Sequence, residues 1–300
     1  MKPAFESTIE RPVSTGERVV LLALFAFTAV AVAGYGVFGL HPEWLPTNSW
    51  ATRFYSVSFP FFARLHIGIT TLVLGFALWR RGGWRWIGAF VSVGMVAFLA
   101  EHIGTGYGVP FSGYAYTGLL GPKVGGRVPW LIPISWFVMA APSYVIARHL
   151  LPGASHTLRR LGLATALLVT WDLALDPAMS FLTPYWLWET PGAFYGMPWV
   201  NLLGWAATGF VIMAVLEGWE RVGPQWRLQL SPGWAAAFYL AVLLMPLGMV
   251  TAAGLWGSVA ATLAALVVLR LLHPSPRSGD PSPRAAGRES EPRRPAEVVG

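Results

Sequence analysis

Apolar residues fall in long runs of about twenty along the chain, separated by short polar or glycine-rich segments. A helix of about twenty apolar residues crosses the hydrocarbon core of a bilayer. The pattern therefore predicts an all-α fold, a polytopic transmembrane helical bundle of about eight spans. The expected spans are Val19–Leu40, Phe59–Trp79, Trp86–Gly104, Trp130–Leu150, Leu161–Phe181, Trp199–Trp219 and two within Gly233–Arg270, with a hinge near Thr251–Gly254.

The two ends of the chain differ in composition from the apolar middle. Residues 1–18 are polar and predict an N-terminal segment outside the bilayer, followed by a transmembrane domain over residues 19–272. Residues 273–300 hold six prolines and five arginines with almost no large apolar side chain, which predicts a disordered tail. Ala31-Val32-Ala33 resembles a signal-peptide cleavage site, but its apolar run is long for a signal sequence, which favours a retained first span.

Basic residues gather on one side of the predicted membrane. Seventeen lysines and arginines fall on the side that holds both termini, and only Arg53, Lys123 and Arg127 fall on the other. Because positive loops face the cytoplasm, this asymmetry predicts cytoplasmic termini and a multi-pass protein of the cell membrane. The net charge of +7 is then a topology signal, and we expect no nucleic-acid partner.

Several kinds of chemistry lack the residues that they need. The chain has no cysteine, which excludes thiolate nucleophiles, iron–sulfur clusters and cysteine-ligated metals. Its six histidines show none of the clustered spacings of a membrane di-iron site. Gly104-x-Gly106-x-Gly108 follows a span rather than a strand and does not fit a dinucleotide loop. We therefore expect neither a metal nor a cofactor.

Trp171-Asp172-Leu173-Ala174-Leu175-Asp176-Pro177 places two carboxyl groups in an otherwise apolar helix. An aspartate near the centre of a span costs roughly 2.5–3.5 kcal/mol on insertion, so two of them need a strong reason. Residues four apart lie on the same helix face. Two neighbouring carboxyls in a poorly solvated site cannot both ionise easily, so this pair predicts a buried proton donor near neutral pH. The spacing does not say which aspartate donates.

Other charged and polar residues that are unfavourable inside a membrane lie, like the two aspartates, toward the outer end of the predicted bundle. Arg64 begins the second span there, and Glu101 and His102 end the third. Both unusual loops lie on that side: Gly104–Pro129 holds eight glycines and three prolines, which forbids a regular helix, and Leu182–Pro198 is rich in aromatic residues. The arrangement predicts one polar pocket near the outer leaflet, covered by these loops.

Two ordered motifs resemble signatures of the carotenoid biosynthesis membrane protein family. The first is EHIGTGYGVPFSGYAYT, from Glu101 to Thr117, followed by Leu120-Gly121-Pro122; the second comprises Trp171-Asp172 to Asp176-Pro177, Trp186-x-Trp188, GAFYGMPWVN from Gly192 to Asn201, and Gly204-Trp205. With the intervening spans, the resemblance covers roughly Phe59–Trp219. This chain departs from the family pattern at Ser112 and Met197.

Characterised members of that family are carotenoid 1′,2′-hydratases, including bisanhydrobacterioruberin hydratases. The resemblance implies a hydro-lyase that needs no redox cofactor and adds water to an acyclic carotenoid such as lycopene or γ-carotene. Asp172 and Asp176 would supply the proton, Glu101 with His102 beside it would orient or deprotonate water, and Arg64 would keep one carboxylate ionised. The residues expected to face the substrate or the water are Tyr114, Tyr116, Trp171, Trp188, Tyr195 and Asn201.

Alternative interpretations use the same residues. A membrane carotenoid cyclase would protonate the same alkene but capture the cation within the substrate. A proton-coupled transporter also needs intramembrane carboxyls, although the polar residues here gather at one end of the bundle. In a purely structural interpretation, Asp172 and Asp176 would form buried ion pairs or cap the helix at Pro177, and Arg64 and Glu101 would anchor helix ends. The substrate's identity and the oligomeric state stay open at this point.

Overall fold

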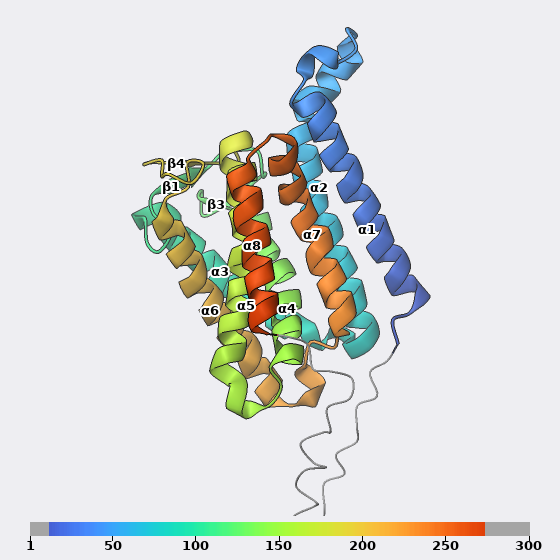
Figure 1. The fold of residues 1–300 in the computed structure, drawn as a ribbon, viewed down its shortest axis with the longest axis vertical. Coiled ribbons are helices and arrows are strands. Elements are labelled where there is room, and N and C mark those ends of the chain that lie inside the picture. The colour runs from blue at the N-terminus through green and yellow to red at the C-terminus, as the bar shows by residue number, and fades with distance from the viewer. Residues whose placement is uncertain (1–11, 274–300) are drawn as a thin grey trace, which may run out of the picture.

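The computed structural model of the protein describes residues 12–273, and most of the predicted N-terminal segment and tail lie outside them. Long helices dominate this part of the chain (Figure 1), which confirms the predicted all-α bundle. The helices are α1 (Thr15–Gly34), α2 (Ser49–Gly82), α3 (Trp86–Tyr107), α4 (Leu131–Leu150), α5 (Thr157–Asp176), α6 (Trp199–Val222), α7 (Pro232–Ala252) and α8 (Trp256–Leu272).

Each expected span overlaps one of these helices. Within the described residues, six helical segments are long and apolar enough to cross a bilayer, and one of them joins α2 and α3 through the short 3-10 turn η3 (Gly83–Arg85). The α8 helix is apolar but shorter, with 17 residues. The other short helical turns are η1 (Tyr35–Gly39), η2 (Pro42–Trp44), η4 (Ala154–His156), η5 (Pro177–Leu182) and η6 (Pro224–Trp226).

The helices run up and down between two ends of the bundle. The α1 helix begins and the α8 helix ends at the end that lies opposite the strands (Figure 1). Helices α1, α2 and α7 form one side, α3 and α6 form the other, and α4 and α5 pack between them. The basic connections between α2 and α3, α4 and α5, and α6 and α7 therefore share the end at which the described chain starts and stops.

Ion pairs fasten the helices at that basic end. Arg81 of α2 binds Glu17 in the first turn of α1, with one guanidinium nitrogen 3.1 Å from Glu17 Oε2. Arg160 of α5 lies 2.7 Å from Glu217 of α6, and the hydroxyl of Tyr144 donates to the same carboxylate at 2.7 Å. Paired and hydrogen-bonded in this way, the buried charges do not leave an uncompensated ion.

Helix boundaries differ from expectation where polar caps outweigh hydropathy. The α2 helix begins at Ser49, ten residues before the expected start at Phe59, because the side chain of Asn48 accepts a hydrogen bond from the backbone nitrogen of Ala51 at 2.7 Å. Residues 49–58, which were expected to lie in the loop between the first two spans, are thus helical. The α5 helix ends at Asp176, and Pro177 begins the π-helical turn η5, as expected for a proline that ends an α-helix.

Short strands join the two unusual loops. Strand β1 (Tyr114–Tyr116) pairs antiparallel with β4 (Trp186–Trp188), so that Tyr114 faces Trp188 and Tyr116 faces Trp186. Strands β2 (Lys123–Val124) and β3 (Val128–Pro129) form a second pair within the glycine-rich loop. The sequence predicted irregular loops here rather than strands. The pairing fixes two segments far apart in the chain over one end of the bundle (Figure 1).

Candidate functional site

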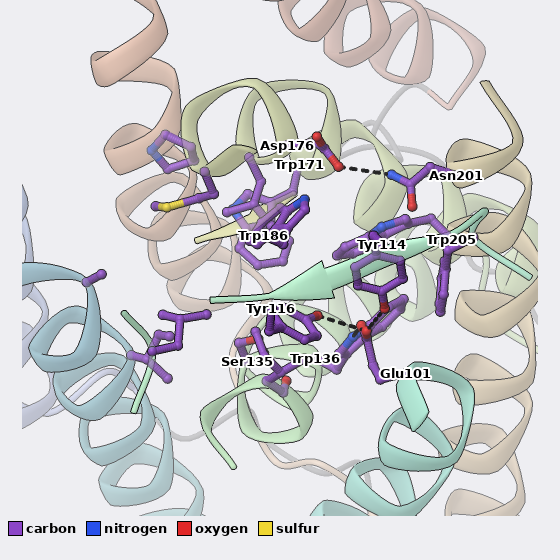
Figure 2. Close-up of a pocket in the computed structure, with 18 of the residues that line it drawn as sticks. Glu101, Tyr114, Tyr116, Ser135, Trp136, Trp171, Asp176, Trp186, Asn201 and Trp205 are labelled. Atoms are coloured by element: carbon purple, nitrogen blue, oxygen red, sulfur yellow. Dashed lines mark hydrogen bonds between the residues drawn. The ribbon is translucent and has the colours of Figure 1, made fainter. Parts of the chain in front are cut away.

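A cavity of about 90 Å³ lies under strands β1 and β4, among α2, α3, α4, α5, α6 and α7. Its wall combines a few polar side chains with many aromatic rings (Figure 2). The polar residues are His66, Glu101, Ser135, Asp176 and Asn201, and the aromatic ones are Phe111, Tyr114, Tyr116, Trp136, Trp171, Trp186, Trp188 and Trp205. Such a mixture is typical of a site for an apolar ligand that must be oriented.

Strand alternation supplies the aromatic cover of the cavity. Successive side chains of a strand point to opposite faces, so Tyr114 and Tyr116 turn inward and are buried, whereas Ala115 between them is exposed. On β4, Trp186 and Trp188 line the cavity and the intervening Leu187 is 55% exposed. The two strands therefore present four rings to the same space.

Glu101, on the last turns of α3, is held by three neutral donors. The indole nitrogen of Trp136 lies 2.9 Å from Glu101 Oε1, the hydroxyl of Tyr116 lies 2.8 Å from Oε2, and the hydroxyl of Tyr114 donates to Oε2 as well. The carboxyl group is only 4% exposed. Hydrogen bonds to a carboxylate compensate in part for the water that burial removes.

Asp172 and Asp176 lie on successive turns of α5 and converge on one amide. The side-chain nitrogen of Asn201, in the first turn of α6, lies 3.1 Å from Asp172 Oδ2 and 3.2 Å from Asp176 Oδ2. Both aspartates are almost fully buried. The structure thus brings the two acidic groups together on one face of α5, next to the residue expected to bind water or product.

The two aspartates have different surroundings. Asp176 lines the cavity, and its Oδ1 accepts hydrogen bonds from Ser180 Oγ at 2.7 Å and from Trp188 Nε1 at 3.2 Å. Asp172 lies behind it, and its Oδ1 has no hydrogen-bond partner among residues 12–273. An unpaired buried carboxylate oxygen is costly. Because Asp176 lines the cavity and Asp172 does not, Asp176 is the member of the pair that a ligand in the cavity can contact.

Within the described chain, none of the ion pairs involves Glu101, Asp172 or Asp176. In the same part of the chain, no three histidine or acidic side chains converge as metal ligands would. Three carboxyls therefore share a largely apolar region with only neutral donors around them. A bound proton would reduce the negative charge of such a group.

Arg64 does not reach these carboxyls, contrary to the expectation that it keeps one of them ionised. Its side chain is exposed, with Nε 2.8 Å from the carbonyl oxygen of Leu119 and a terminal nitrogen 3.1 Å from that of Gly118. A guanidinium is less costly at an exposed loop with carbonyl acceptors than in an apolar cavity. Arg64 thus holds the segment that follows β1.

Two further expected residues lie outside the cavity wall. His102 follows Glu101 on α3 and therefore points about 100° away from it, where its ring stacks on Phe98 at 5.5 Å. Tyr195 accepts a hydrogen bond from the backbone nitrogen of Gly257 at 3.0 Å and so ties the aromatic loop to the start of α8. Seven of the expected residues do line the cavity: Glu101, Tyr114, Tyr116, Trp171, Asp176, Trp188 and Asn201.

Three tryptophans of the wall were not among the residues expected to face the substrate, although the second motif contains Trp186 and Trp205. The rings of Trp136 and Trp205 stack with centroids 4.1 Å apart, and Trp186 of β4 lines the same cavity. Two of these could have been found: Trp205 is four residues from Asn201 and so shares its helix face, and Trp186 is two residues from Trp188 and so shares its strand face. Trp136 lies in an apolar span without such a marker.

The arrangement can carry out acid–base chemistry on an apolar molecule. In the view of Figure 2, Asp176 with Asn201 and Glu101 with the tyrosines lie on opposite sides of the aromatic cluster. Aromatic faces attract positive charge, and they add no nucleophile that would trap a carbocation irreversibly. The site thus places two carboxyl groups, those of Glu101 and Asp176, and an aromatic wall around one cavity.

Comparison with known proteins gives two matches. A family model described as "Carotenoid biosynthesis protein" matches residues 62–269. The chain is also 35% identical over 148 residues to a bisanhydrobacterioruberin hydratase of Haloarcula japonica. That alignment covers 48% of this chain and 49% of the relative, so it spans about half the length of the curated relative. No solved structure matches the chain.

Proposed function

The chain belongs to the carotenoid biosynthesis protein family, and from that premise we propose that it is a carotenoid hydratase of the cell membrane. Its substrates would be water and an acyclic carotenoid end, as in lycopene or γ-carotene. The name of the Haloarcula relative supports hydration as the reaction. The apolar helices support a protein that meets such a substrate within the bilayer.

The observation that carries the proposal is a buried pair of aspartates of which one, Asp176, lines an aromatic cavity. An acyclic carotenoid ends in a trisubstituted alkene, which reacts with water only after protonation. Asp172 and Asp176 share one amide donor, and neither takes part in an ion pair among residues 12–273, so the pair is suited to holding a proton.

Asp176 is the proposed proton donor because it lines the cavity and Asp172 does not. Its proton is transferred to the less substituted carbon of the alkene, which leaves a tertiary cation on the neighbouring carbon. A positioned acid of this kind contributes about 10²–10⁴-fold to a rate. Asp172 is a positioning residue that keeps the proton within the pair.

Glu101 is the proposed acceptor of the proton that water loses. A carboxylate offers about four lone-pair sites, and the three donors on Glu101 leave one at Oε1, the oxygen that Trp136 alone contacts. A water held there adds its oxygen to the tertiary cation and gives up a proton to Glu101. Alkene and water are thereby converted into a tertiary alcohol, and the proton on Glu101 returns to the aspartate pair through solvent.

The aromatic wall would stabilise the cation between the two proton transfers. Tyr114 and Trp188 lie with ring centroids 5.2 Å apart over the cavity, and Trp171 meets Trp205 edge to face at 5.8 Å. A desolvated cation over such rings gains about 2 kcal/mol or more. Trp171 Nε1 is buried without an acceptor among residues 12–273, so it is available to the incoming water or the new hydroxyl.

Product analysis in a lycopene-producing bacterial host tests this function. We expect the wild-type protein to give products heavier than lycopene by the mass of one or two waters, and Asp176→Asn to abolish them. Glu43→Gln, which removes an exposed carboxylate that does not line the cavity, is the matched control and should retain activity. Products of unchanged mass but cyclic structure would identify a cyclase instead, and unaltered lycopene would refute both.

A further inference from the structure

A second cavity, of about 100 Å³, lies next to the first. It is bounded by α1, η1, α2, η5 and α7, on the side of the bundle away from Glu101. Met179 and Met245 line both cavities. These two side chains are therefore the partition between one space that contains the acidic groups and another that does not.

The second cavity has the character of a site for a hydrocarbon. No charged side chain lines it. The hydroxyl of Ser58 already donates to the carbonyl of Tyr55 at 2.8 Å, and that of Tyr185 donates to the carbonyl of Phe59 at 2.7 Å. The remaining wall is largely aromatic and aliphatic, so the gain on filling it comes from burying apolar surface.

The partition between the cavities is made of adaptable side chains. Methionine is unbranched, has three rotatable side-chain bonds, and repacks around neighbours of different shape. Met245 is 6% exposed on α7, and Met179 is half-buried on η5. A rotation of these thioethers can join the two spaces without a change of backbone.

The second cavity also reaches the surface of the bundle. Phe38 on η1 is 38% exposed and Phe54 on α2 is 43% exposed, and both line the cavity. Because α1 and α2 are apolar helices of membrane-spanning length, this surface is the one that lipid tails would contact. The opening is thus placed for a molecule dissolved in the bilayer.

Resting on the proposed function, we propose that the second cavity binds the polyene chain of the substrate while its reacting end occupies the first. A carotenoid is a stiff rod about as long as the hydrocarbon core is thick, ~30 Å, so a cavity that holds its end needs apolar space beyond it. The substrate would pass Met179 and Met245 and leave the protein between Phe38 and Phe54.

Gly34 allows the second cavity to be filled selectively. It lines that cavity, and a Cβ atom built on it meets nothing within 4 Å, so a larger side chain fits there without displacing a neighbour. Gly34→Phe, with Gly34→Leu as a smaller step, is the test pair. Gly94→Phe is the matched control, because Gly94 is also a helical glycine with nothing within 4 Å of its Cβ but lines neither cavity.

Two measurements on the full-length proteins, purified from a lycopene-producing host, decide the matter. Visible absorbance gives lycopene bound per protein, and mass spectrometry gives hydrated product. We expect Gly34→Phe to lower bound lycopene by about tenfold, Gly34→Leu to lower it less, and Gly94→Phe to leave it unchanged. If Gly34→Phe aggregates on gel filtration, Gly34→Leu decides alone.

The two readouts separate this inference from the proposed function. Bound lycopene that falls with Gly34→Phe, without hydrated product in any protein, would refute hydration and keep the polyene site. Equal lycopene in wild type, Gly34→Phe and Gly34→Leu would overturn the polyene site whether or not product forms. A wild-type protein that binds no lycopene and forms no product would overturn both.

Discussion

The side-chain amide nitrogen of Asn201 lies 3.2 Å from Asp176 Oδ2, and the same nitrogen lies 3.1 Å from Asp172 Oδ2. One residue of α6 thereby connects two acidic groups that are one turn apart on α5. Protonation of either aspartate changes what this amide can donate to the other. The pair and its amide therefore act as one unit, and changes at Asn201 reach both carboxyls.

Replacing Asn201 with leucine should slow hydration. Asn201→Leu keeps a similar volume but removes the donor shared by both aspartates, and a hydrogen bond to a charged or acidic group is worth about 1.5–3 kcal/mol. We expect a loss of about tenfold or more in hydrated product, measured in membranes with excess lycopene. Asn201→Asp, which adds a third carboxyl, should lose more. Full activity in Asn201→Leu would show that the amide has no part in proton transfer.

The two aspartates should differ in their response to the same change. Asp176→Asn removes the acid that lines the cavity, so its hydration rate should fall by about 10²–10⁴-fold. Asp172→Asn keeps that acid and should retain measurable activity, because an amide can still neighbour Asn201. Initial rates of product formation for both variants provide the comparison. A larger loss in Asp172→Asn would reverse the assigned roles.

Glu101 should respond differently in stability and in activity. In Glu101→Gln the indole of Trp136 and the hydroxyls of Tyr114 and Tyr116 are left with one side-chain oxygen instead of two, so at least one buried donor loses its acceptor and the melting temperature falls. Adding Trp136→Phe removes the opposing indole donor and should restore much of the melting temperature. Hydration should stay low in the double variant, because the proton acceptor is still absent. Recovery of both properties together would make Glu101 a structural residue only.

Arg64 should matter for stability more than for chemistry. Arg64→Gln removes donors to the carbonyls of Gly118 and Leu119, and each such hydrogen bond is worth about 1 kcal/mol. We expect a lower melting temperature in detergent and a hydration rate within about threefold of wild type once folded protein is compared. Loss of activity with an unchanged melting temperature would place Arg64 in the reaction after all.

The orientation of the bundle across the membrane can be measured by single-cysteine labelling, because the chain has no cysteine of its own. Val124 of β2 is 49% exposed at the end of the bundle that carries the strands. Arg159 is exposed near the start of α5, at the opposite end of the bundle. In intact cells, a membrane-impermeant maleimide should label Val124→Cys and not Arg159→Cys. The reverse pattern would invert the predicted orientation, and labelling of both would contradict the bundle itself.

The position of Asp172 and Asp176 could be predicted from the sequence because a carboxyl group in a membrane helix has a high free-energy cost. A carboxyl in an apolar helix needs a functional or structural reason, and the four-residue spacing already places Asp172 and Asp176 on one face. The helices themselves followed from apolar runs of bilayer length. Glu101 was recognisable for a similar reason, as an acid at the end of a span close to a loop rich in tyrosine.

The positions of Arg64 and Trp136 could not be anticipated in this way. Arginine has a long side chain whose partner is set by whatever loop lies nearby, and here that loop supplies carbonyl oxygens rather than a carboxylate. Trp136 is one aromatic residue in an apolar span, so nothing in its neighbours marks it as the donor to Glu101. Such contacts depend on tertiary packing, which hydropathy and spacing do not encode.

The pairing of β1 with β4 was hidden for a different reason. Strands of three residues are too short for an alternating pattern to be distinguished from a loop sequence. The two paired strands also lie about seventy residues apart in the chain. Only Trp186-x-Trp188 and Tyr114-x-Tyr116 hinted at a period of two. The pairing lies over one end of the bundle (Figure 1), and its four aromatic side chains line the cavity there.

The register of β1 and β4 limits how this site can vary between related proteins. Shifting either strand by one residue would turn Ala115 or Leu187 inward and send the rings beside them to the outside. An insertion or deletion close to these strands would thus exchange a whole set of rings for small aliphatic groups in a single step. Diversity in ligand choice is more accessible through point substitutions on the inward positions, with the lengths of both loops kept constant.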